Sequence, residues 1–226
     1  MLQRFFIASK LGGTNELKLP PEVSHQLKSV LRAKTGEKII LFDGSSYDFI
    51  SEFQGESAKI VEKVLNRREP ERKIFLFQSL LKKDKMEWVF QKGTEVGAAG
   101  FFPVLSARSV KKDFNKVRAE KIIKEAAEQS GRGILPQIHE VLDFKSALEF
   151  VQKERLAGVL ADGNSKKHIS EILKEPKMAF FVGPEGGFTQ EEVSETRECG
   201  FQVANLGRLT LRSETAAVIA SAFLVL

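Results

Sequence analysis

Cysteine is almost absent from this 226-residue sequence: Cys199 is the single one, and there are three histidines. One cysteine cannot form a disulfide within the chain, and the scattered histidines give no metal-ligand spacing such as a paired CxxC. These shortages exclude a disulfide-rich secreted domain and the common zinc sites. We therefore expect no bound metal and a reducing compartment, the cytoplasm.

Long apolar runs are missing as well. No run approaches the roughly 18 residues of a membrane-spanning helix, and the apolar start of the chain, MLQRFFI, is far shorter than the core of a signal peptide. We therefore expect no membrane partner. Proline is sparse, with 7 residues, whereas 42% of the residues are hydrophobic and 29% are charged, which is typical of a folded globular protein. The length allows one large domain or two small ones.

Acidic residues are outnumbered, and the formal net charge is +5. Between positions 108 and 124 only Asp113 and Glu120 oppose a cluster of basic residues. The cluster consists of Arg108, Lys111, Lys112, Lys116, Arg118, Lys121 and Lys124. Such a cluster attracts phosphate backbones, but a solvated helix face gives the same pattern. Both interpretations stay open at this point.

The first 70 residues contain short β-type runs separated by turn residues at 43–45 and 54–55. The runs cover 4–8, 38–42, 47–53 and 58–65, and they predict a small, mostly antiparallel barrel. One helix is expected after Pro20, and it ends before Gly36. Its apolar positions at helical spacing are Val23, Leu27, Val30 and Leu31. The charged segment 66–72 has no apolar residue and is the best linker candidate.

After residue 73 apolar strands alternate with longer helices, which predicts an α/β domain with a largely parallel sheet covered on both faces. The expected strands are 74–81, 101–105, 156–161, 178–182 and 201–206. The expected helices are 85–96, 117–130, 144–153 and 189–199, and 214–226 is apolar enough for a buried terminal helix.

A glycine loop at 183–187 follows the fully apolar strand ending at Val182. Its glycines allow the backbone to approach a ligand at the carboxyl edge of the sheet. Thr189 and Glu192 then have the spacing of a capping box that starts the next helix. A phosphate loop is the rival interpretation, but the Gly-Lys-Ser/Thr ending is absent and Glu185 would repel phosphate. A tight turn without a ligand is the other alternative.

A second loop, at 207–213, follows the last predicted strand, and the turn 161–163 follows another. In a parallel sheet the three strand ends lie at the edge where small ligands bind. S-Adenosyl-L-methionine (AdoMet) suits such a site, because it carries no phosphate and needs backbone amides and apolar walls. In the alternative interpretation Arg212 and Glu214 simply form an ion pair on the surface.

Six segments resemble, in the right order, those of the ribosomal RNA small subunit methyltransferase E family, which methylates N3 of a uridine in 16S ribosomal RNA. They are RFF at 4–6, VLR at 30–32, QKGTEVG at 91–97, EAAEQSGR at 125–132, VGPEGGFT at 182–189 and LGRLTLRSETA at 206–216. The chain departs mildly from the family pattern, with Val96 where leucine is usual and a variable stretch at 208–210. Neither change removes a group that the chemistry needs.

The resemblance implies a PUA-like RNA-binding β-barrel at 1–70 and a SPOUT-type α/β methyltransferase domain at 73–226 with a C-terminal trefoil knot. It also implies a homodimer that binds AdoMet in the knot, with 16S ribosomal RNA of the assembling or complete small subunit as the partner. The residues implied for the cofactor are Gly183, Glu185, Gly186, Gly187, Leu206, Gly207, Leu211, Thr215 and Ala216. Those implied for RNA are Arg4, Arg32, Lys92, Arg108, Gln129 and Arg132, together with the basic stretch from Lys111.

Uracil N3 is a weak nucleophile until its proton leaves, so the site must stabilise an anion. Arg212 is the candidate, because a planar guanidinium suits two carbonyl oxygens, and Glu214 is expected to orient it or to accept the proton. Gln129 and Glu95 have an alternative as buried structural hydrogen-bonding groups. The rival functions are a catalytically silent RNA-binding or ribosome-assembly protein, and a nucleotide hydrolase, for which the sequence lacks a Walker lysine.

Overall fold

The computed structural model describes residues 2–226, so that Met1, the first residue of the expected barrel, lies outside the described part. The chain divides into two compact units. The first comprises residues 1–69 and 127–135, and the second comprises residues 70–126 and 136–226. None of the helices in residues 2–226 combines the length and the apolar character needed to cross a lipid bilayer.

The first unit is built on a five-stranded sheet with the order β1-β3-β4-β5-β2. The strands are β1 (Arg4–Phe6), β2 (Glu16–Lys18), β3 (Lys38–Phe42), β4 (Tyr47–Phe53) and β5 (Ser57–Leu65). Neighbours pair antiparallel except β1 and β3, which run parallel. Along β4, Phe49, Ser51 and Phe53 are buried and alternate with more exposed residues. This period of two places one face of the strand on an apolar core.

The expected helix after Pro20 is shorter than its apolar pattern indicates. Its elements are α1 (Pro21–His25) and a π-helical turn, η1 (Gln26–Val30). Val23 and Leu27 are buried, but Val30 is 66% exposed and Leu31 is 37% exposed. The wider π turn shifts the angular position of each following side chain, so the last two of the four apolar residues lie outside the core.

The boundary between the two units falls inside the segment proposed as a linker, and its first part, residues 66–69, is held in the first unit by hydrogen bonds. Asn66 donates to the Asp48 carboxylate and to the main-chain oxygen of Gly131, both at 3.0 Å. Glu69 accepts from the guanidinium of Arg132 at 2.8 Å and from two backbone amides after it. Residues 127–135 thus belong to the first unit through polar contacts, which the hydrophobic pattern of the sequence does not predict.

The second unit contains a parallel sheet with the order β12-β10-β11-β6-β7-β8, and β9 pairs with β7. The strands are β6 (Lys73–Ser79), β7 (Gly100–Leu105), β8 (Gln137–Ile138), β9 (Leu142–Asp143), β10 (Ala157–Ala161), β11 (Lys177–Val182) and β12 (Gln202–Ala204). The central strands are mostly apolar, as expected for a sheet that is buried on both faces, although β6 ends in the buried polar residues Gln78 and Ser79. The predicted parallel α/β sheet is therefore confirmed, with strand ends shifted by one or two residues.

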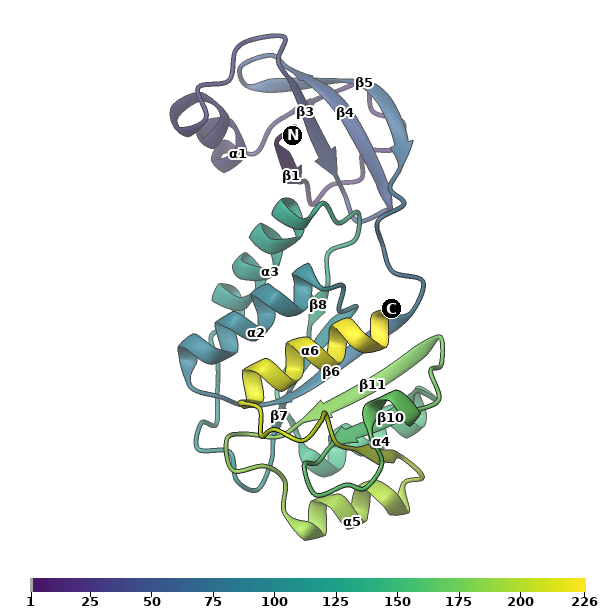
Figure 1. The fold of residues 1–226 in the computed structure, drawn as a ribbon. Coiled ribbons are helices and arrows are strands. Elements are labelled where there is room, and N and C mark those ends of the chain that lie inside the picture. The colour runs from purple at the N-terminus through teal and green to yellow at the C-terminus, as the bar shows by residue number, and fades with distance from the viewer. Residues whose placement is uncertain (1) are drawn as a thin grey trace. The chain divides into compact units, whose positions relative to one another are not determined.

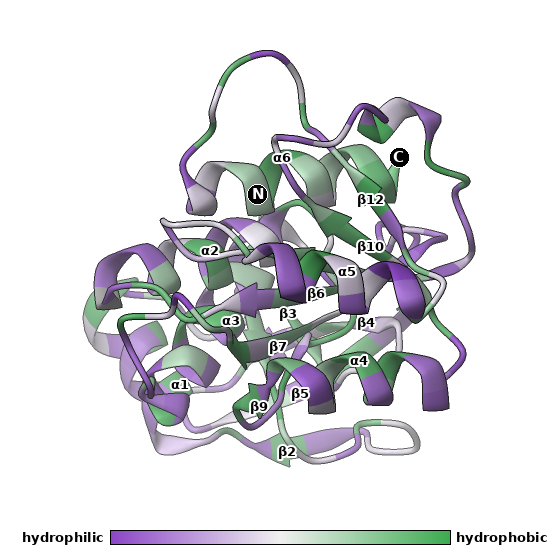
Figure 2. Cartoon of the chain, turned by 90° about the horizontal axis from the view of Figure 1, so that it is seen from below, coloured by the Kyte–Doolittle hydropathy of each residue, from purple (hydrophilic) through white to green (hydrophobic). Residues whose placement is uncertain are grey.

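Helices cover both faces of this sheet (Figure 1). They are α2 (Lys83–Glu95), α3 (Lys116–Ser130), α4 (Phe144–Lys153), α5 (Gln190–Glu198) and α6 (Ser213–Val225), with a short 3-10 turn, η2 (Ile169–Glu171). Phe77, Phe102 and Phe181 stack in the core beneath α4 and α5. On the other face α6 packs against β6, β11 and α2. Figure 2 shows that α6 is hydrophobic over most of its length, whereas α4 alternates.

Candidate functional site

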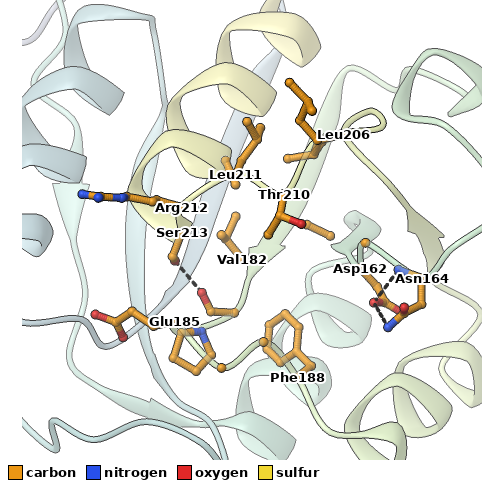
Figure 3. A pocket seen from close by; sticks show the side chains of 18 of the residues that line it. Asp162, Asn164, Val182, Glu185, Phe188, Leu206, Thr210, Leu211, Arg212 and Ser213 are labelled. Carbon is orange, nitrogen blue, oxygen red and sulfur yellow. Dashed lines mark hydrogen bonds between the residues drawn. The ribbon is translucent and has the colours of Figure 1, made fainter.

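The strand order creates a crevice at the carboxyl edge of the sheet. The chain leaves β6 toward β7 but leaves β11 toward β12, on the opposite side. In open α/β sheets such a reversal point is where ligands bind. Here the ends of β10 and β11 and the loop after β12 surround a pocket of about 730 Å³. Figure 3 shows Leu206, Leu211 and Phe188 around its middle, with Asp162 and Asn164 at one end.

The first glycine loop forms a tight, hydrogen-bonded turn. The amide of Gly187, which has φ +68°, donates to the Pro184 oxygen at 2.9 Å. The predicted capping box is confirmed, because the Thr189 and Glu192 side chains each accept a hydrogen bond from the other's backbone amide. Arg108 donates to the Gly186 oxygen at 2.7 Å, so an arginine expected to contact RNA braces this loop.

A buried polar chain joins this loop to the start of α6. Gln78, at the end of β6, is 1% exposed and donates to the Ser213 hydroxyl at 3.0 Å. The Ser213 hydroxyl in turn donates to the Gly183 oxygen (Figure 3). Gly207, in the second loop, has φ +127°, which side-chain-bearing residues rarely adopt. The two glycine loops are therefore fixed against one another by side chains from β6 and α6.

One end of the pocket carries charge. Lys85, in the first turn of α2, donates to the Glu185 carboxylate at 2.9 Å, and Arg212 extends to the same side of the pocket as Glu185 (Figure 3). The pKa of Lys85 is raised, first by its hydrogen bond to Glu185. Burial alone would raise the pKa of Glu185, but the hydrogen bond from Lys85 and nearby lysine charges lower it. Both groups are therefore charged at neutral pH.

Glu214 lies in the first turn of α6 and is half-buried. Its Oε2 is buried and has no hydrogen-bond partner among the described residues. The ion pairs of residues 2–226 do not include one between Arg212 and Glu214, so the surface pair considered from the sequence is absent. The Arg212 side chain is exposed and extends to the side of the pocket away from Asp162 and Asn164 (Figure 3).

The structure brings most of the expected cofactor residues together. Those that line the pocket are Gly183, Glu185, Gly186, Gly187, Leu206, Gly207, Leu211 and Ala216, along with the expected catalytic residue Arg212. Thr215 and Glu214 are the expected residues outside this lining. Sequence reasoning missed Lys85, Phe188 and Gln78. The position of Lys85 just after a buried strand was an available signal.

The residues expected to contact RNA differ in their exposure and in their partners. Arg4 and Arg132 are each 6% exposed, and their guanidinium groups bind Asp48 and Glu69. Arg32, with φ +53°, is exposed, as are Arg108 and Gln129. Lys92 binds Glu95 at 2.9 Å. The exposure of Gln129 contradicts its alternative as a buried hydrogen-bonding group, whereas Glu95 does have a structural partner.

The comparisons with known proteins point in one direction. A family described as an RNA methyltransferase domain matches residues 67–225. The protein of Bacillus subtilis called Ribosomal RNA small subunit methyltransferase E is 32% identical over 97% of this chain and 94% of its own length. The protein of the same name from Mesomycoplasma hyopneumoniae is 30% identical over 96% of each chain.

Solved structures give the same result. The crystal structure of a Ribosomal RNA small subunit methyltransferase E from Neisseria gonorrhoeae, bound to S-adenosyl methionine, is 30% identical, with a TM-score of 0.92. The similarity covers 99% of this chain and 96% of that one. A putative methyltransferase from Legionella pneumophila, in complex with bound SAM, has a TM-score of 0.88 at 30% identity, over 99% and 97% of the two chains.

Proposed function

Since the chain belongs to the ribosomal RNA small subunit methyltransferase E family, we propose that it methylates N3 of a uridine in 16S ribosomal RNA. It is an enzyme that uses AdoMet to methylate ribosomal RNA. The observation that carries the proposal is the pocket of about 730 Å³ between two glycine loops, with an arginine at one end. A silent RNA-binding protein has no need of this pocket.

The pocket fits AdoMet by its chemistry. Backbone of the two loops and the apolar side chains of Leu206, Leu211 and Phe188 offer amides and carbonyls beside an apolar wall. When bound, AdoMet supplies an electrophilic methyl group. The pocket-lining residues that would hold it are Gly183, Glu185, Gly186, Gly187, Leu206, Gly207, Leu211 and Ala216, and Thr215, also expected from the family, lies outside the lining. Glu185 acts by bracing the loop, because its carboxylate is already held by Lys85.

Arg212 is the residue proposed to act on the substrate. The N3 proton of uracil must pass to solvent before the nitrogen attacks, and the resulting negative charge spreads onto the two flanking carbonyl oxygens. A permanently charged guanidinium at the charged end of the pocket stabilises this anion. Because Glu214 forms no ion pair with Arg212, it is proposed only as a positioning residue of the first turn of α6, and not as the base, since a carboxylate beside the developing anion would oppose the reaction.

RNA binding follows the two-domain division expected from the family. We propose that residues 1–70 form a PUA-like RNA-binding barrel, with residues 127–135 belonging to the same compact unit, and that the rest of 73–226 forms a SPOUT domain that binds AdoMet and dimerises. The groups proposed to contact RNA are the exposed Arg32, Arg108 and Gln129, the half-buried Lys92 and the basic stretch from Lys111. Such contacts position the RNA without reading its sequence. For Arg4 and Arg132, their buried ion pairs favour a role in holding the first unit together.

We also propose the trefoil knot and the homodimer. In support of the knot, α6 follows the edge strand β12 but packs against β6 and β11 in the middle of the sheet. In support of the homodimer, the packed helices α2 and α6 leave Trp88 39% exposed and Ile219 48% exposed. Such apolar side chains are typical of subunit interfaces. The substrate and the single cysteine favour the cytoplasm.

The test combines cofactor binding with product mapping. Calorimetry should show one AdoMet site per chain. Small ribosomal subunits from cells lacking this enzyme should accept one labelled methyl group, and nuclease digestion with mass spectrometry should locate it on N3 of a uridine. Binding of small-subunit RNA without any methyl transfer would instead favour the catalytically silent alternative.

A further inference from the structure

A second pocket, of about 340 Å³, lies in the second unit beside the first half of α2 and the segment that leads into α3. Leu81, Met86 and Phe90 form a buried apolar floor, each at most 3% exposed. Phe114 is half-buried and adds an aromatic wall, with its ring centroid 5.8 Å from that of Phe90. The volume is at the lower end of the range for small-ligand sites, so the pocket holds one flat group.

The rim of this pocket is charged. Arg118 binds Glu87 at 3.2 Å, and Lys111 and Asp113 are exposed at the edge. Among the ion pairs of the described residues, none involves Lys111. An apolar floor with an aromatic wall and a free cation suits a nucleobase, whose ring stacks while its phosphate stays at the rim. An apolar protein side chain would need the floor but not the cation.

The second pocket adjoins the first. Lys85 lines the first pocket, and the next two residues of the same helical turn line the second. On the other wall, Arg108 lines the first pocket and Lys111 the second. No described residue lines both pockets, but these neighbouring positions lie at the end of the first pocket that carries Lys85, Glu185 and Arg212, where we propose that the target uracil binds. A nucleotide next to the target therefore comes close to the second pocket.

We propose that the second pocket binds the base of an unpaired nucleotide adjacent to the methylated uridine. This inference rests on the proposed function, because it takes RNA as the substrate. The neighbouring base leaves the stack, enters the pocket and packs against Phe114, while Lys111 contacts its phosphate. Unstacked bases held by aromatic side chains are the usual means by which proteins recognise single-stranded RNA. The pocket thus holds the target strand beside the first pocket.

Variants of Phe114 test the stacking contact. Phe114→Leu keeps an apolar side chain but removes the ring, and Phe114→Tyr keeps the ring. With unmethylated small subunits as substrate, Phe114→Leu should raise KM roughly tenfold, with kcat and AdoMet affinity unchanged. Phe114→Tyr should have the same KM as the parent enzyme. The matched control is Val110→Ala, a 79% exposed neighbour that does not line the pocket, which should change nothing.

A second arm identifies the occupant. Two substrates are small subunits reconstituted with an abasic nucleotide, one on each side of the target uridine. For one of these two substrates, the KM of the parent enzyme should rise as much as it rises in Phe114→Leu with the unmodified subunit. That substrate should cause no further loss in the variant. An unchanged KM for Phe114→Leu overturns the inference. A raised KM for Phe114→Leu without any effect of either abasic nucleotide also overturns it, because the pocket then binds a protein side chain and not a base. If the parent enzyme transfers no methyl group, the proposed function fails instead.

Discussion

The hydroxyl of Ser213 donates a hydrogen bond to the main-chain oxygen of Gly183, 30 residues earlier in the sequence. The same hydroxyl accepts a hydrogen bond from Gln78 at 3.0 Å. Three elements therefore meet at one buried oxygen: the end of β6, the first glycine loop and the start of α6. Because both loops shape the cofactor pocket, this one hydroxyl links pocket geometry to the packing of α6.

Ser213→Ala should weaken AdoMet binding about tenfold, because a buried partner left without its hydrogen bond costs roughly 1–3 kcal/mol. Calorimetry measures the affinity. The control is Ser221→Ala in the same helix, since the buried Ser221 hydroxyl has no hydrogen-bond partner among the described residues. This control should bind AdoMet as the parent does. Equal affinities for both variants would contradict the proposed link.

Gly207→Ala should also reduce AdoMet affinity. The φ of +127° at Gly207 is rarely open to a residue with a side chain, and forcing it costs about 1–3 kcal/mol. The loop would relax away from its pocket-lining geometry. Gly12→Ala is the control, because Gly12 has ordinary φ and open space around it. Calorimetry should give a Kd for AdoMet that is roughly five-fold or more higher in Gly207→Ala than in Gly12→Ala. Equal Kd values would count against the second loop as part of the pocket.

Arg212→Lys should lower turnover at least tenfold, roughly, while AdoMet affinity changes little. Lysine keeps the charge but loses the planar pair of donors that matches two carbonyl oxygens. Part of the lost rate should return as pH rises, because solvent then helps to remove the N3 proton. Single-turnover rates measured across pH check both points. A variant with the parent rate would remove Arg212 from the mechanism.

Cys199→Ala should leave activity intact. Direct attack of N3 on the methyl group needs no covalent adduct with the enzyme, and Cys199 caps the end of α5 beside the core. Burial, followed by the charges of Glu195, Glu198 and Glu149, raises the pKa of its thiol. The thiol should therefore react slowly with iodoacetamide at neutral pH compared with the unfolded chain. An inactive variant that still folds and binds AdoMet would contradict the direct mechanism.

Stability should fall as the solution becomes mildly acidic. Burial, and then the charge of Lys116, lower the pKa of His139 below its ordinary 6.5. In the unfolded chain this histidine binds a proton near pH 6.5, whereas in the folded chain it binds one only at lower pH. The free energy of unfolding therefore decreases as the pH falls from about 6.5 toward the pKa of the folded state. His139→Phe keeps the stacking on Phe102 and should flatten this dependence in urea titrations. If the free energy of unfolding changed with pH equally in the parent and in His139→Phe, His139 would not be the source of the pH dependence.

The second unit was largely predictable because its signals are local. Apolar runs such as 178–182 and the helical spacing in 144–153 fix strands and helices within one or two residues. The capping box at Thr189 needed only residues three positions apart. Parallel strand ends meet at one edge by geometry, which is why the glycine loops could be placed together before the structure was known.

The remaining features depend on contacts between distant residues. The pair of Lys85 and Glu185 spans 100 positions, and the contact of Gln78 with Ser213 spans 135. The assignment of residues 127–135 to the first unit depends on polar groups such as Asn66. The π turn at η1 likewise follows no apolar period. Hydrophobic patterns determine which faces are buried, but they carry no information on which polar side chains meet.

The position of α6 last among the elements of the pocket has a consequence for the order of synthesis. The chain leaves the ribosome from its N-terminus, so the sheet and the first glycine loop can form before residues 213–225 emerge. Until then Gly183 lacks Ser213, Gln78 is uncovered and one pocket wall is missing. We therefore expect a nascent chain to bind the methyl donor only after residues 213–225 have emerged and packed.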